Sequence, residues 1–157
     1  MKVFHSYGSK ERLFEMMKKV NGIALNGKKQ NINEEVIPQE ERQKILEKFI
    51  EFVDEKLQLG ENMPKIIISY DGNEAKNMLS FGKNVPESKE IRVVDKNRNL
   101  ADTCRTLGHE LKHTDQYIKG KLNPSSGDDG TESENEANAF AGVVMREFAR
   151  KYPIIFE

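Results

Sequence analysis

The order of apolar and polar positions along the chain predicts helices in both halves and short strands between them. The clearest helical period runs from Pro38 to Gly60, where apolar residues recur every three or four positions with charged residues between them. That apolar stripe comprises Leu46, Phe49, Ile50, Val53 and Leu57. A shorter helix is predicted after Ser9, followed by an exposed polar loop over residues 21–38. Residues 1–60 are therefore expected to be a mainly helical N-terminal part.

Short segments in the region that follows have the pattern of β-strands. Residues 65–70 are rich in isoleucine and end at the turn signal Asp71-Gly72. Residues 78–81 predict a second short strand, ahead of the turn-rich stretch 82–88. Residues 90–95 alternate in a way that predicts a third strand, which we expect at an edge of the sheet. The strands are thus expected within residues 64–95.

Two more helices are predicted in the C-terminal part, residues 98–151. The first spans about Asn99 to Tyr117, and a loop rich in Gly, Ser and Asp follows at 120–130. The last helix is expected to start at Thr131 or Ser133 and to end before Pro153. The buried face of the first of these helices is expected to carry Leu100, Cys104, Leu107 and Leu111. A helix, then strands, then two helices predicts an α+β fold, organised as a single domain over residues 1–157.

Composition narrows the class of protein. Among 157 residues, 25 Lys and Arg balance 26 Asp and Glu, so the chain lacks the basic excess of a nucleic-acid binder. A single cysteine, Cys104, excludes an internal disulfide and fits a reducing compartment. No apolar run approaches the ~20 residues of a membrane span, and the first residues lack the apolar region of a secretory signal. We therefore expect a cytoplasmic protein without nucleic-acid or membrane partners.

The predicted helix 99–117 contains His109-Glu110-Leu111-Lys112-His113, an H-E-x-x-H motif. Residues four apart lie on one helix face, about 5–6 Å apart at Cβ, so both imidazoles can converge on one ion. Zinc binds neutral imidazole at about 2.0–2.1 Å, which this spacing allows. Glu110 lies about 100° around the helix from His109, beside the metal. There it can take a proton from a zinc-bound water and pass it to a leaving amine.

A catalytic zinc also needs a third protein ligand and an open position. His5 is far upstream of the motif, and the helical period places Cys104 on the buried side of the helix. The remaining candidates are carboxylates at the start of the last helix, namely Glu132, Glu134 and Glu136. Spacing alone leaves the choice open, because Thr131-x-x-Glu134 and Ser133-x-x-Glu136 both also fit helix-capping boxes.

The H-E-x-x-H motif and the segment Glu134-Asn135-Glu136-Ala137-Asn138-Ala139-Phe140-Ala141 together resemble the gluzincin metallopeptidases. The likeness is to the cytoplasmic branch of ImmA/IrrE-like proteases and minigluzincins, and it covers about residues 91–148. It implies that His109, His113 and Glu134 bind one zinc ion per chain. It also implies that Asn138 is hydrogen-bonded to a ligand histidine, which we expect to be His109. The small residues Ala137 and Ala141 fit a close approach of the two helices.

The resemblance further implies a zincin-like fold and a polypeptide substrate. In such folds a small mixed sheet has an edge strand before the H-E-x-x-H helix, and an extended peptide adds to that edge. The expected function is a zinc-dependent endopeptidase with Glu110 as catalytic base and Tyr117, one turn after His113, as a candidate transition-state stabiliser. The alternative is a non-catalytic, metal-binding regulatory or interaction module. The presence of Glu110 favours catalysis over this alternative.

Overall fold

The computed structural model describes residues 2–7, 37–122 and 131–156. In chain order the elements are β1 (Val3–Ser6), α2 (Gln39–Leu57), β2 (Lys65–Ser69), α3 (Gly72–Met78), β3 (Gly82–Val85), β4 (Glu90–Val94), α4 (Leu100–Ile118) and α5 (Glu132–Lys151). Short 3-10 turns occupy Gly60–Asn62, Pro86–Ser88 and Pro153–Phe156. The sequence-based expectation of an α+β fold is confirmed. The first predicted helix and most of the loops 21–38 and 120–130 lie outside the described residues.

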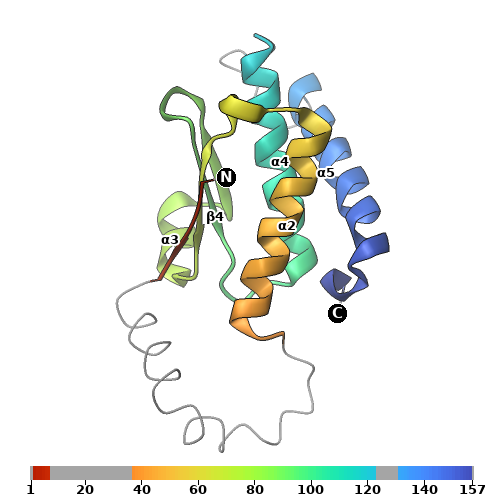
Figure 1. The fold of residues 1–157 in the computed structure, drawn as a ribbon. Coiled ribbons are helices and arrows are strands. Elements are labelled where there is room, and N and C mark those ends of the chain that lie inside the picture. The colour runs from red at the N-terminus through yellow and green to blue at the C-terminus, as the bar shows by residue number, and fades with distance from the viewer. Residues whose placement is uncertain (1, 8–36, 123–130, 157) are drawn as a thin grey trace, which may run out of the picture.

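The strands form one mixed sheet with the order β1-β2-β4-β3. Strands β1, β2 and β4 are parallel, and β3 pairs antiparallel with β4, with Asn84 opposite Ile91. The long helices α2, α4 and α5 lie on one side of this sheet and α3 lies on the other (Figure 1). Helix α4 contacts the sheet through β3 and β4, and α5 packs along α4. The H-E-x-x-H helix is therefore in the middle of the domain.

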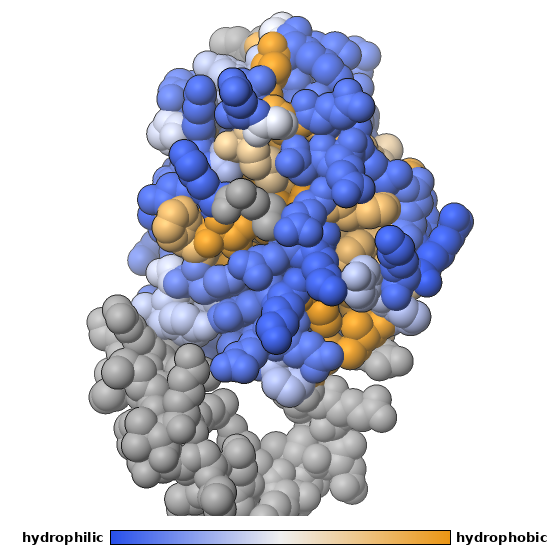
Figure 2. Space-filling model, viewed as in Figure 1, coloured by the Kyte–Doolittle hydropathy of each residue, from blue (hydrophilic) through white to orange (hydrophobic). Residues whose placement is uncertain are grey.

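The core lies between the sheet and the long helices. The stripe predicted on α2 is buried at Leu46, Phe49, Ile50 and Val53, as is the predicted face of α4. The rings of Phe49 and Phe148 meet edge to face, with centroids 5.2 Å apart. Ile155 in the C-terminal turn is also buried against this core. The face of the molecule over α2 is mainly hydrophilic, as the charged positions between the apolar ones predict (Figure 2).

Two predictions for residues 78–88 are wrong. The strand predicted at 78–81 is absent, because Met78 is the last residue of a helix and residues 79–81 form a turn. Residues 72–78 form helix α3, because Asp71 caps its start by accepting a hydrogen bond from the Asn73 N–H at 3.0 Å. The helix ends at Leu79, whose φ of 59° is left-handed. The stretch 82–85, read from sequence as turn, is strand β3. Its first three residues, Gly82, Lys83 and Asn84, are small or polar, so the apolar alternation that predicts a strand is missing.

The predicted edge position of residues 90–95 is also wrong. Strand β4 pairs with β2 on one side and β3 on the other, so β3 forms the edge beside α4. Burial of Ile91, Val93 and Val94 fits an interior strand covered on both faces. Directly after β4, buried Asp95 accepts hydrogen bonds from Arg42 Nε at 3.0 Å and from Thr103 of α4 at 2.5 Å. These bonds hold the start of α4 against α2.

Strand β1, which is parallel to β2, lies in the N-terminal part that the sequence predicts to be mainly helical. Within the described residues, no helix combines the length and apolar character needed to cross a membrane.

Candidate metal centre

Helices α4 and α5 approach each other closely beside the histidine motif. Gly108 makes this possible, because a Cβ atom there would lie 3.3 Å from Val144 Cγ2 and 3.4 Å from the Ala141 Cα. Ala137 and Ala141 are fully buried on the facing side of α5. Helix α5 begins where the Thr131 hydroxyl accepts a hydrogen bond from the Glu134 N–H at 3.3 Å. The cap fixes where α5 begins, and the small contact residues let the two helices approach closely. Together they bring the first turn of α5, which contains Glu134, next to the histidines.

Three side chains from the two helices converge at this point. His109 Nε2 lies 3.1 Å from His113 Nε2 and 3.0 Å from Glu134 Oε1. His113 Nε2 lies 3.0 Å from Glu134 Oε2. A tetrahedral zinc with bonds of about 2.0–2.1 Å separates its donor atoms by about 3.3 Å. The two imidazoles and the carboxylate therefore fit the donor set and spacing of a zinc site, and these residues could hold a metal ion.

Side chains outside this group hold both histidines. His109 makes a side-chain hydrogen bond with Asn138, the position at which sequence analysis expected its partner. His113 Nδ1 lies 2.7 Å from Gln116 Oε1, a contact that sequence analysis missed. The spacing of Gln116, three residues after His113 on one helix, was the available signal. Burial lowers the pKa of His109 although the charge of Glu134 opposes this shift, so the ring favours its neutral, metal-binding form.

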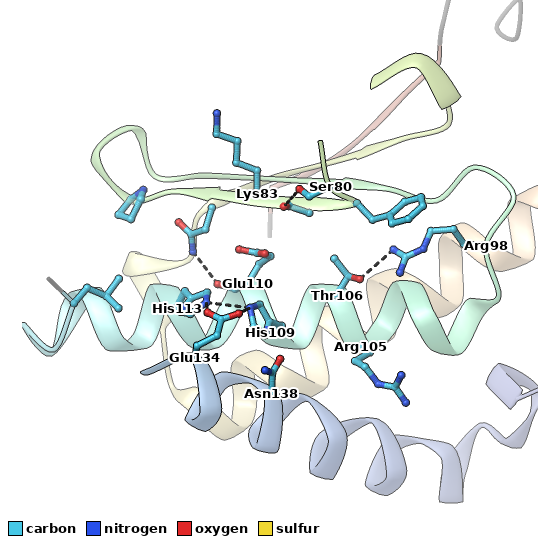
Figure 3. A pocket seen from close by; sticks show the side chains of 15 residues that line it. Ser80, Lys83, Arg98, Arg105, Thr106, His109, Glu110, His113, Glu134 and Asn138 are labelled. Carbon is cyan, nitrogen blue, oxygen red and sulfur yellow. Dashed lines mark hydrogen bonds and ion pairs between the residues drawn. The ribbon is translucent and has the colours of Figure 1, made fainter. Parts of the chain in front are cut away.

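Glu110 lies between the histidines and the edge strand. Its side chain points toward β3 (Figure 3). Burial, together with the charge of Glu134, raises the pKa of Glu110 to about 7. Strand β3 comes close to the Glu110 side chain because Gly82 has no Cβ; one there would lie 3.3 Å from Glu110 Oε1. The Asn84 amide fixes the strand by donating to the Glu110 carbonyl at 2.8 Å and to the Thr114 hydroxyl at 2.9 Å.

The converging side chains line an open cleft of about 730 Å³. One wall is the segment from Ser80 to Pro86 that contains β3, and the opposite wall is α4 with the start of α5 (Figure 3). Arg98 and Arg105 line the cleft near the N-terminal half of α4. Arg98 Nη1 donates to the Thr106 hydroxyl at 3.0 Å, and its guanidinium lies 4.3 Å from the centre of the Phe81 ring. The cleft is therefore bordered by an edge strand, a buried carboxylate and the three candidate metal ligands.

The structure places the other candidate residues away from the cluster. Glu136 accepts a hydrogen bond from Gln116 Nε2 at 3.0 Å, so among the glutamates at the start of α5 it is Glu134 that faces the histidines. Cys104 is fully buried in the core, and His5 bonds to the Tyr70 hydroxyl at 2.9 Å. Tyr117 is half-exposed and lines a neighbouring pocket instead of this cleft.

Comparisons with protein-family models, with curated proteins and with solved structures found no match to this chain.

Proposed function

We propose that this protein is a zinc-dependent metallopeptidase that hydrolyses peptide bonds in a polypeptide substrate. One observation carries the proposal: His109, His113 and Glu134 converge within 4.8 Å of one another, in a cleft that also contains the buried carboxylate of Glu110. Two imidazoles and one carboxylate form the protein ligand set of a catalytic zinc site, which leaves a position open for water or substrate. The gluzincin resemblance of the same residues supports the same conclusion.

Zinc in such a site activates a water molecule and polarises the carbonyl of the bond to be cleaved. In this proposal Glu110 accepts the proton of the attacking water on its carboxylate. Its raised pKa of about 7 suits a group that must accept and then release a proton near neutral pH. The protonated Glu110 then donates to the amine that leaves. Asn138 and His109 form a hydrogen-bonded pair that orients the ligand ring.

Strand β3 supports a polypeptide as the substrate class. It is at the end of the described sheet, and it borders the cleft through Gly82 and Asn84. An extended peptide can add to such an edge through main-chain hydrogen bonds, which bind it independently of its side chains. The peptide would then lie beside β3 in the cleft, which is also lined by Glu110 and the three candidate ligands.

The test compares wild type with Glu110→Gln and His113→Ala. Elemental analysis should find about one zinc per chain in wild type and Glu110→Gln, and little in His113→Ala. Hydrolysis is measured on fluorescein-labelled, unfolded casein and on a mixed peptide library. Glu110→Gln should lower kcat/KM by about 10²- to 10⁴-fold, the usual contribution of a general base.

The possible results separate the proposal from its alternative. Wild type that binds no zinc after reconstitution would contradict the metal site itself. Zinc binding with equal cleavage by wild type and Glu110→Gln would contradict the role of the base. Zinc binding without hydrolysis of any peptide would favour the non-catalytic metal-binding module.

A further inference from the structure

Gln116 is a long polar side chain in an almost fully buried position. It is 1% exposed and lies on α4 one turn after His113, facing the first turn of α5. A buried amide is costly unless its donors and its acceptor are all paired. Here each end of the amide has a partner, and the identity of those partners determines which way the amide is turned.

The nitrogen end of the amide faces α5. Gln116 Nε2 donates to the Ser133 carbonyl at 2.9 Å and to Glu136 Oε1 at 3.0 Å. Both partners only accept hydrogen bonds when Glu136 is ionised, so the opposite orientation of the amide would bring oxygen against oxygen. The oxygen end of the amide is consequently turned toward His113, where Oε1 lies 2.7 Å from Nδ1.

This orientation determines where the proton of His113 resides. An amide oxygen can only accept, so the short contact requires a hydrogen on Nδ1. A neutral imidazole carries one ring hydrogen, which leaves a lone pair on Nε2. His113 Nε2 lies 3.1 Å from His109 Nε2 and 3.0 Å from Glu134 Oε2, so a cation bound among these atoms would meet that lone pair. The His113 tautomer is therefore the one that binds a cation between these atoms.

We infer that Gln116 is a positioning residue that holds His113 in the Nδ1–H tautomer and joins it to the turn of α5 that carries Glu134. This inference rests on the proposed zinc site. Ser133 and Glu136 flank Glu134 along the chain, so one buried amide connects ligands that come from two different helices. Asn138 acts on His109, whereas Gln116 acts on His113, so each ligand imidazole has its own partner outside the metal group.

The first experiment measures zinc affinity by competition with a chelator. Gln116→Met keeps the length of the side chain but cannot pair with His113 Nδ1, and it should weaken zinc binding about 10- to 100-fold. Glu132→Gln, at an exposed position in the same first turn of α5, is the matched control and should bind zinc as wild type does.

A second measurement reads the tautomer directly and needs neither zinc nor a substrate. Long-range ¹H–¹⁵N NMR of metal-free wild type, at alkaline pH where the ring is neutral, should show His113 with its hydrogen on Nδ1. In Gln116→Met the same ring should become a mixture of tautomers.

A hydrogen on Nε2 of His113 in wild type would overturn the inference, as would unchanged zinc affinity in a folded Gln116→Met protein. If wild type binds no zinc, the proposed function fails while the tautomer measurement still decides the role of Gln116.

Discussion

Replacing Glu110 with glutamine should change how the stability of the metal-free protein depends on pH. Burial, with a smaller effect of the Glu134 charge, raises the pKa of Glu110 from 4.5 to about 7. Between these two values the folded protein holds a proton that the unfolded chain has released. The stabilisation by this proton is fully present below pH 4.5, and it is lost as pH rises through 7. Glutamine stays neutral throughout, so the variant does not undergo this loss.

The size of this change in stability follows from the difference between the folded and unfolded pKa values of Glu110. Because proton binding is linked to folding, the contribution of Glu110 to the free energy of unfolding should fall by about 2–3 kcal/mol between pH 5 and pH 8. Relative to wild type, the free energy of unfolding of Glu110→Gln should rise by that amount over the same range. The other titratable groups are the same in both proteins, so their contributions to the pH dependence largely cancel in the difference.

The assay is urea unfolding of chelator-treated protein at several pH values from 5 to 8. Glu51→Gln, at an exposed position of α2, is the matched control, and its stability should follow wild type at every pH. Parallel curves for wild type and Glu110→Gln would refute the reasoning, because Glu110 would then titrate alike in the folded and unfolded states. If wild type instead became more stable relative to Glu110→Gln as pH rises, the predicted direction of the effect would be wrong.

Two further predictions concern the ligand set and the edge strand. Glu134→Ala should lose most bound zinc, whereas Glu136→Ala should retain it; the reverse result in elemental analysis would move the third ligand to Glu136. Gly82→Ala should destabilise the protein by about 1–3 kcal/mol in urea unfolding, because the new Cβ would overlap the Cγ2 methyl of Thr106. Thr106→Ser removes that methyl and should recover much of the stability in the double variant, and a lack of recovery would place the strain elsewhere.

The metal-ligand motif and the main helices could be predicted from local sequence. His109 and His113 share a helix face because of the helical period, which acts within a few residues and needs no tertiary information. The same holds for the apolar stripe of α2 and for the cap at Thr131. The resemblance to gluzincins also selected Glu134 and Asn138, and the structure places both next to the histidines.

The edge strand and the partner of His113 depend on tertiary structure. The segment Gly82–Val85 has no strand pattern of its own. It forms β3 because it pairs with β4 and because Gly82 and Asn84 pack against α4. Likewise, the amide of Gln116 is oriented by Ser133 and Glu136 on another helix. Sequence therefore determined which chemical groups share one helix. The packing of α4 against α5 and β3 decided which of them meet, because those contacts join residues far apart in the chain.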